Sequence, residues 1–305
     1  MRAFSIPMRT RFRGLTRRDG ALLQGPEGWG EFSPFAEYGP AEAARWLAAA
    51  REAAFDGWPA PLRERIPVNV TVPAVGPEQA HRIVKAGGCR TAKVKVAERG
   101  QADADDLARV EAVRDAIGPE GRVRIDVNGG WDADHAVKMI RLLDRFDLEY
   151  VEQPCATVEE LALVRRRVEV PVAADESIRR AEDPYLVRDA EAADIAVLKV
   201  QPLGGVRAAL RVAEEIGLPV VVSSAVETSV GLAAGLALAA ALPDLPYACG
   251  LATLQLLEGD VAADPLVVED GCIAVRRPRV GEEELARFEV DPGAWRRRAE
   301  EAGSA

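Results

Sequence analysis

From Ile66 onward the sequence alternates short β-branched runs with longer amphipathic stretches rich in Ala, Arg and Glu. The runs begin roughly every 23 to 31 residues, a spacing that fits βα units and a parallel sheet. The expected strands are Val68–Val72, Ala92–Val96, Val123–Val127, Leu148–Glu152, Val172–Ala174, Ile195–Val200, Pro219–Val222 and, as the weakest of the eight, Tyr247–Leu251. The clearest helices between them are Asp103–Ile117, Asp134–Phe146, Val158–Arg167 and Val206–Ile216. Eight short β-branched strands of this kind favour an α/β fold closed into a barrel.

A doubly wound open sheet is the alternative fold. It is weakened because the first strand is followed by no Gly-x-Gly-x-x-Gly turn and the chain has no Walker lysine loop. After the eighth strand the repeat lacks its helix. Gly271–Val275 instead predicts an extra strand, and the tail from Gly281 is charged.

The first sixty residues follow a different pattern. Strand-like pieces at about Arg2–Met8, Ala21–Gln24 and Gly30–Phe32 are interrupted by Gly and Pro. A helix is expected from Ala41 to about Phe55, after Pro40. We therefore expect a small α+β domain in residues 1–62, with contributions from 270–305, packed on a barrel domain in residues 63–269.

The charge balance excludes several partners. The chain has 39 Lys and Arg against 49 Asp and Glu, a formal net charge of −10. Such a surface repels phosphate backbones, so we expect neither nucleic-acid nor anionic-membrane binding. The longest apolar stretch, Val230–Leu242, is too short to span a bilayer and stops at Pro243.

Cysteine usage indicates a reducing compartment. The four cysteines form no Cys-x-x-Cys pair, and we interpret them as reduced thiols. The first seven residues lack the apolar core of a signal peptide. We expect a cytoplasmic protein whose oligomeric state the sequence leaves open, a monomer included.

Carboxylates stand at the carboxyl ends of three successive strands, where a barrel of this kind places its chemistry. They are Asp126, Glu152 and Asp175, spaced by one βα unit each. Oxygen ligands without His or Cys suit a hard cation, so we expect Mg²⁺, with Mn²⁺ as the alternative.

Lysines flank this row of acids. Lys95 stands one strand before it and Lys199 one strand after it, and Lys93 shares a face with Lys95. A cation that binds a substrate carboxylate acidifies the proton on the adjacent carbon. A lysine can remove that proton when burial and neighbouring cations lower its pKa. The pattern therefore predicts proton abstraction α to the carboxylate of a small molecule.

Each motif alone has an ordinary structural explanation. An Asp before Asn-Gly-Gly is usually a turn residue, and a Lys-x-Lys pair usually lies on a solvated face. Their joint occurrence at consecutive strand ends favours a functional site. A non-catalytic binding barrel with a vestigial site is the alternative outside enzymes, but we would expect it to have lost at least one ligand or lysine.

The order Lys-x-Lys, Asp-x-Asn, Glu-Gln-Pro, Asp-Glu-Ser and Lys-x-x-Pro resembles the enolase superfamily, and specifically its muconate-lactonizing-enzyme subgroup. The likeness covers nearly the whole chain, since Gly30–Pro34 and the helix after it resemble the capping domain of that family. Arg124, the run Ser223–Ser229 and the short chain are most similar to the o-succinylbenzoate synthases of menaquinone biosynthesis. The resemblance implies a modified TIM barrel, (β/α)7β, with a small α+β capping domain, in agreement with the missing eighth helix.

The resemblance also implies roles for the charged residues. Asp126, Glu152 and Asp175 would hold Mg²⁺. Lys95 would abstract the proton and then assist departure of the hydroxyl, Lys199 would stabilise the enediolate from the opposite side, and Lys93 would tune Lys95. The implied reaction is the syn-dehydration of 2-succinyl-6-hydroxy-2,4-cyclohexadiene-1-carboxylate to 2-succinylbenzoate.

Five further residues would contact the substrate by the same resemblance. Arg124 and Asn128 would orient the lysine and substrate oxygens. Ser223, Ser224 and Gly250 would line the pocket for the succinyl arm.

Several absences narrow the choice within the superfamily. Mandelate-racemase-like members carry a His at the end of the seventh strand, where this chain has Ser223 and Ser224. Dipeptide epimerases carry an Asp-x-Asp pair on the eighth strand, and residues 250–255 contain no carboxylate. Racemization of N-acyl or N-succinylamino acids needs the same two lysines and stays open as the enzymatic alternative.

Other reactive side chains are interpreted as structural. His81 and His135 fall in amphipathic helices and are expected at the surface, and Cys155 is expected to be a packed small residue. The arginines between Arg9 and Arg18 belong to a region that forms a mobile loop over the active site in the family, so one of them is a candidate for the succinyl carboxylate. The tail Arg296–Arg298 is expected to be an exposed helix end.

Overall fold

A seven-stranded parallel sheet forms the centre of the molecule, in the order β11-β10-β9-β8-β7-β6-β5. The computed structural model describes residues 1–180 and 183–305. The strands are β5 (Val70–Val72), β6 (Thr91–Lys95), β7 (Arg122–Asp126), β8 (Leu148–Glu152), β9 (Val172–Ala174), β10 (Ile195–Leu198) and β11 (Val220–Val222). This order confirms the predicted run of βα units, since each strand pairs with its sequence neighbour.

Residues 247–251 close the sheet without forming a regular strand. Cys249 bridges to Val68, and Gly250 bridges to Ser223. The Cys249 amide donates to Pro67 O at 2.7 Å, and the Gly250 amide donates to Val222 O at 2.8 Å. The strand expected at 247–251 is therefore wrong as a regular element, because only Cys249 and Gly250 bridge to the neighbouring segments, one on each side. The barrel is closed all the same.

Helices connect the strands, and most of them cover the outside of the sheet, whereas the single turns α6 and α8 lie at the carboxyl ends of β9 and β10. They are α2 (Pro77–Gly87), α3 (Asp103–Ile117), α4 (Ala133–Leu143) with the 3-10 turn η2 (Asp144–Phe146), α5 (Val158–Arg165), α6 (Glu176–Arg179), α7 (Leu186–Asp189), α8 (Val200–Leu203), α9 (Val206–Ile216) and α10 (Ser229–Ala241). Small and β-branched side chains from the strands and helices share one large buried core. Twelve residues of α10, Ser229–Ala240, are buried, so the longest apolar stretch of the sequence is a core helix. In the described part of the chain, no helix has the length and apolar character needed to cross a membrane.

In the part of the chain that the structure describes, the closing segment is not followed directly by a helix of the barrel repeat. The 3-10 turn η3 (Ala252–Leu256) takes its place. The extra strand predicted at 271–275 is present as β12 (Cys272–Ala274), which pairs antiparallel with β4 (Arg65–Pro67). The architecture is the modified (β/α)7β barrel that the sequence predicted.

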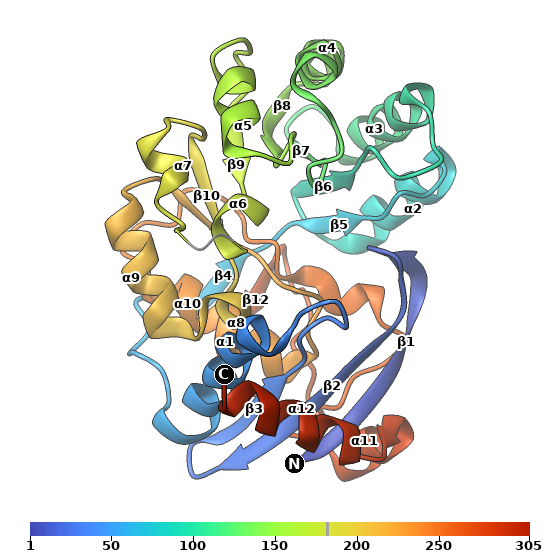
Figure 1. The fold of residues 1–305 in the computed structure, drawn as a ribbon. Coiled ribbons are helices and arrows are strands. Elements are labelled where there is room, and N and C mark those ends of the chain that lie inside the picture. The colour runs from blue at the N-terminus through green and yellow to red at the C-terminus, as the bar shows by residue number, and fades with distance from the viewer. Residues whose placement is uncertain (181–182) are drawn as a thin grey trace.

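An antiparallel sheet and helix α1 form a cap against the barrel (Figure 1). The sheet has the order β13-β1-β2-β3, with β1 (Arg2–Phe12), β2 (Leu15–Gly25), β3 (Gly28–Phe32) and β13 (Glu289–Val290). The helices here are α1 (Pro40–Arg51), the π-helical turn η1 (Glu52–Asp56), α11 (Glu282–Phe288) and α12 (Gly293–Gly303). Figure 1 shows both chain termini in this part of the molecule. The division at residues 62 and 63 stays a prediction.

The arginine-rich segment is a hairpin rather than an irregular loop. Strands β1 and β2 pair antiparallel up to Phe12 opposite Leu15, so Arg13 and Gly14 alone make the turn. Both turn residues have positive φ, +52° and +78°. Glycine adopts such angles freely, whereas an arginine does so at some conformational cost.

The C-terminal helix also makes more contacts with the rest of the chain than expected. Arg298 on α12 is half-buried. It donates to the carbonyl oxygens of Pro34, Phe35 and Tyr38 at 2.9, 2.6 and 3.0 Å. The expected exposure of the whole Arg296–Arg298 run is therefore wrong at Arg298, because the helix lies against the 34–39 segment and turns that side chain inward.

Candidate active site

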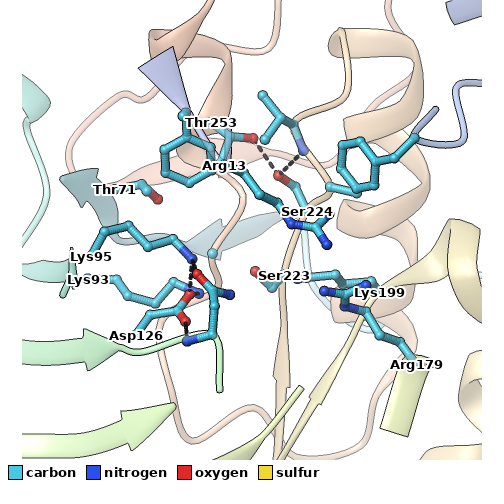
Figure 2. Close-up of a pocket in the computed structure, with 16 residues that line it drawn as sticks. Arg13, Thr71, Lys93, Lys95, Asp126, Arg179, Lys199, Ser223, Ser224 and Thr253 are labelled. Carbon is cyan, nitrogen blue, oxygen red and sulfur yellow. Dashed lines mark hydrogen bonds and ion pairs between the residues drawn. The ribbon is translucent and has the colours of Figure 1, made fainter. Parts of the chain in front are cut away.

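A cavity lies where the carboxyl ends of the barrel strands face the cap. Figure 2 shows Lys93 and Lys95 on one side of it and Lys199 on the other. Its lining residues are Phe12, Arg13, Phe35, Thr71, Lys93, Lys95, Asp126, Asn128, Arg179, Lys199, Ser223, Ser224, Ala225, Val226, Gly250 and Thr253. The cavity therefore combines barrel residues with three side chains from the cap.

The three predicted carboxylates lie side by side at the base of this site. Asp126 ends β7, Glu152 ends β8, and Asp175 follows β9 directly. Asp126 and Glu152 stand opposite one another in the strand register. All three residues are at most 1% exposed. Burying three acids together is unfavourable unless cations accompany them.

Lysine ammonium groups supply that charge. Lys93 Nζ lies 2.7 Å from Glu152 Oε2 and 3.3 Å from Asp126 Oδ2. Lys95 Nζ donates to Asp126 Oδ2 at 2.5 Å. The structure thus brings the first two lysines and the first two acids together, as the two-residue period of the strands predicted.

Lys199 pairs with the third acid, apart from Lys93 and Lys95. Lys199 Nζ donates to Asp175 Oδ2 at 2.6 Å. Burial lowers the pKa of Lys199 from its ordinary value, although the charge of Asp175 opposes this effect. A lysine in this setting loses its proton more readily than one in water.

The acids respond unequally to their surroundings. Burial, together with the negative charge of Asp126, raises the pKa of Glu152 to about 7, although Lys93 opposes the shift. Burial alone would also raise the pKa of Asp126, but Lys95 and Lys93 outweigh it and hold the pKa below its ordinary value. The lysines therefore compensate the negative charge of Asp126 fully but that of Glu152 only in part.

The donor set fits Mg²⁺ in its chemistry. Within the described residues, no three Asp, Glu, His or Cys side chains converge on one point as ligands. The three acids face the lysines instead. They are nevertheless hard oxygen donors at neighbouring strand ends. A divalent cation would offset both the burial of the charge and the repulsion from Asp126, which together raise the pKa of Glu152. Asp126, Glu152 and Asp175 are the residues that would hold it.

Asn128 and Gln153 hold this row in place. Asn128 Oδ1 accepts a hydrogen bond from Lys95 Nζ, and Asn128 Nδ2 donates to Glu176 Oε1 at 3.1 Å. Gln153 Oε1 accepts from the amide of Asp175 at 2.9 Å. Both residues have positive φ, +51° and +43°. Asn128 thus lies at the lysine as expected, whereas Gln153 was noted only as part of the Glu-Gln-Pro motif.

Arg124 does not line the cavity, so its expected contact with the substrate is wrong. Its Nε donates to Glu149 Oε2 at 2.5 Å and its Nη1 donates to Ala248 O at 2.7 Å, inside the barrel. The guanidinium lies 4.6 Å from the centre of the Tyr150 ring. Arg124 shares a face with Asp126, but two residues along a strand place it about 7 Å deeper.

Ser223, Ser224 and Gly250 line the far wall of the cavity, as predicted. Ser224 Oγ and Thr253 Oγ1 are 2.5 Å apart, and Ser224 Oγ accepts from the Val226 amide. A Cβ atom at Gly250 would lie 2.6 Å from Ser223 Oγ. A larger residue there would force the Ser223 side chain to move, because the two segments approach closely.

Seven lining residues were not singled out from the sequence as site residues, among them Ala225, Val226 and Thr253 on the far wall. Phe12 and Phe35 come from the cap, and Thr71 and Arg179 come from the barrel. Lys95 Nζ lies 5.3 Å from the centre of the Phe12 ring, and Arg13 lies 4.4 Å from that of Phe35. Phe12 and Phe35 reach the cavity only because the cap docks on the barrel, and no local sequence pattern predicts that docking.

The residues interpreted as structural lie outside the cavity. His81 and His135 pair with Asp115 and Asp103 on partly exposed helix surfaces. Cys155 is buried, as expected for a packed residue, and the four cysteines are free thiols.

Comparisons with known proteins agree with this geometry. The family described as "Enolase C-terminal domain-like" matches residues 77–281, and "Enolase N-terminal domain-like" matches residues 3–54. The chain is 74% identical to the o-succinylbenzoate synthase of Thermobifida fusca, over 100% of this chain and 96% of the relative. It is 58% identical to the o-succinylbenzoate synthase of Mycolicibacterium smegmatis, over 89% of this chain and 84% of the relative.

Solved structures with the same fold are more distant in sequence. The N-succinyl Arg/Lys racemase of Bacillus cereus superposes with a TM-score of 0.80 at 21% identity, over 95% of this chain and 96% of that one. The muconate lactonizing enzyme of Pseudomonas fluorescens superposes with a TM-score of 0.80 at 22% identity, over 95% and 97%. At these identities the likeness establishes the fold alone. The sequence matches go further: this chain belongs to the enolase superfamily and, within it, to the o-succinylbenzoate synthase family of hydro-lyases.

Proposed function

We propose that the protein dehydrates 2-succinyl-6-hydroxy-2,4-cyclohexadiene-1-carboxylate to 2-succinylbenzoate, with Mg²⁺, in menaquinone biosynthesis. The observation that carries the proposal is the placement of Lys95 and Lys199 on opposite sides of one cavity (Figure 2). Both lysines pair with members of a row of three buried carboxylates, Asp126, Glu152 and Asp175. A chain 74% identical to a named o-succinylbenzoate synthase supports the choice of substrate. We also place the reaction in the cytoplasm, since the cysteines are free thiols.

Lys95 is the proposed base. Its Nζ lies at the cavity wall between Asp126 and Asn128, which fix its direction. In the free-amine form it takes the proton from the carbon that bears the substrate carboxylate. The resulting ammonium then gives a proton to the departing hydroxyl on the same face, so that water leaves and the ring becomes aromatic. When bound, Mg²⁺ supplies positive charge to the substrate carboxylate as negative charge develops there.

Lys199 acts from the other side of the ring. Its ammonium group, held by Asp175, lies where a cation stabilises a flat, electron-rich ring from its face. Lys93 bridges Glu152 and Asp126 and keeps the acid row from repelling an anionic substrate. The lysines thus divide into a proton carrier and two fixed charges.

The cap and the far wall give the pocket its shape. Phe12 and Phe35 line the cavity from the cap, and their apolar rings leave less room for water beside the substrate. Arg13 is the only one of the five hairpin arginines that lines the cavity, so we assign it to the succinyl carboxylate. Ser223, Ser224 and Gly250 line the space for the succinyl arm.

The test is an absorbance assay of aromatisation with purified protein, Mg²⁺ and the cyclohexadiene substrate. We expect turnover by the natural chain and a loss of about 10³-fold or more in kcat for Lys95→Ala, because general base catalysis of this kind contributes about 10²- to 10⁴-fold and the same group also serves as the acid. Absence of turnover, or turnover retained by Lys95→Ala, would contradict the mechanism. The first result would favour a non-catalytic barrel.

A second assay separates the two enzymatic alternatives. The same preparation is incubated with N-succinyl amino acids in deuterated water, and exchange of the α proton is followed by NMR. We expect exchange to be slow compared with dehydration. Exchange that is faster than dehydration would assign the site to racemization instead.

A further inference from the structure

Arg179 connects the acid row to the cap. It ends helix α6, four residues after Asp175, and is 3% exposed. Its Nε donates to Asp175 Oδ1 at 2.9 Å, and its Nη2 donates to Glu176 Oε1 at 2.5 Å. Its Nη1 donates to the hydroxyl of Tyr38, which belongs to the cap. Figure 2 shows Arg179 beside Lys199 at the cavity.

Tyr38 is itself held firmly. It is 5% exposed and makes edge contacts with Phe35 and Trp46, with ring centres 5.7 and 5.9 Å apart. Its carbonyl oxygen accepts a hydrogen bond from Arg298 of the C-terminal helix at 3.0 Å. The hydroxyl that meets Arg179 is therefore fixed by the packing of the cap and is not free to follow the barrel.

Two cations share the Asp175 carboxylate without competing for one atom. Lys199 Nζ lies at Oδ2, and Arg179 Nε lies at Oδ1. The planar guanidinium fixes the plane of the carboxylate and leaves further lone pairs on both oxygens free to accept. An ammonium group would neutralise the charge but could not impose that orientation.

We propose that Arg179 and Tyr38 are positioning residues through which the docked cap orients the Asp175 carboxylate toward Mg²⁺. The inference rests on the proposed function, since it takes Asp175 as a ligand of that cation. It assigns to the cap a part in metal affinity in addition to covering the substrate.

The experiment measures Mg²⁺ binding by calorimetry, without substrate, in the full chain freed of metal with a chelator. The variants are Tyr38→Phe, Arg179→Lys and the pair combined. Groups that orient a metal ligand typically change affinity by about 10- to 100-fold, so we expect Arg179→Lys to weaken binding about tenfold. Tyr38→Phe is expected to weaken it by a smaller factor, because the arginine stays in place. The combined variant should lose little more than Arg179→Lys alone, because Tyr38 acts through Arg179.

Arg180→Lys is the matched control. Arg180 lies 5.1 Å from the Tyr38 ring and 3.3 Å from Glu42, and we expect this substitution to leave Mg²⁺ affinity unchanged. Tyr38→Phe keeps the ring packing, so melting temperatures without metal verify that this variant is folded. Equal Mg²⁺ affinity in the natural chain, Tyr38→Phe and Arg179→Lys would overturn this proposal alone. Failure of the natural chain to bind Mg²⁺ would overturn the proposed metal site and this inference together.

Discussion

At the scale of single residues, Arg124 points into the barrel on the same strand face as Asp126, as predicted, but it lies too deep in the barrel to line the cavity. Its guanidinium lies inside the barrel, 4.6 Å from the Tyr150 ring centre and 5.8 Å from that of Tyr247. Glu149 balances its charge, and Asn69 accepts from Nη1 at 3.2 Å. A side chain so placed stabilises the barrel and has no path to a substrate in the cavity.

Arg124→Lys is therefore expected to lower stability and leave substrate affinity unchanged. The ammonium group cannot replace the planar fork, so buried acceptors lose partners and the free energy of unfolding falls by about 2 kcal/mol. Urea unfolding measures the first quantity, and KM in the aromatisation assay measures the second. A raised KM with unchanged stability would return Arg124 to the substrate site.

At the scale of elements, the β1–β2 hairpin delivers its turn to the cavity. Arg13 occupies the turn with a φ of +52°, an angle that favours glycine or asparagine. Its guanidinium packs on the Phe35 ring at 4.4 Å and lies 3.7 Å from Glu37. A strained backbone that presents a charged side chain to a pocket is typical of a binding position.

Arg13→Gln tests that assignment. Loss of a charge-assisted hydrogen bond to the succinyl carboxylate is expected to raise KM about tenfold or more, with a smaller effect on kcat. Arg11→Gln is the control, because Arg11 lies two residues before Arg13 on strand β1 but is exposed and does not line the cavity. Equal KM values for the two variants would remove Arg13 from the substrate site.

The sequence predicts the barrel side of this site better than the cap side. Asp126 and Lys95 could be placed because a charged residue inside a β-branched run marks a strand end, and the two-residue period then gives its face. Phe12 and Tyr38 carry no such local mark. They reach the site only because the cap docks on the barrel. Contacts between segments that are far apart in the sequence produce no periodic pattern that could predict them.

At the scale of the whole molecule, a buried polar cluster joins the cap to the barrel beside the site. Glu31 of β3 accepts hydrogen bonds from the Thr228 hydroxyl and from the amides of Thr228 and Gly231, at the start of α10. Arg18 of β2 donates to Val226 O at 3.0 Å. Burial raises the pKa of Glu31 to about 7, with Arg18 opposing the shift and Glu227 adding to it.

This cluster makes the attachment of the cap sensitive to pH. Glu31 has an ordinary pKa of 4.5 and a folded value of about 7, so the folded chain binds its proton more tightly. The corresponding stability is fully present below about pH 4.5 and is lost as pH rises through about 7, an effect of about 3 kcal/mol.

We expect the free energy of unfolding to fall more steeply between pH 5 and pH 7.5 in the natural chain than in Glu31→Gln, which cannot titrate at that position. Urea unfolding at both pH values measures the two slopes. Glu42→Gln, at a partly exposed position of α1 outside this cluster, is the control that should keep the natural slope. Identical slopes in the natural chain and Glu31→Gln would show that Glu31 does not couple the cap to the barrel through its proton.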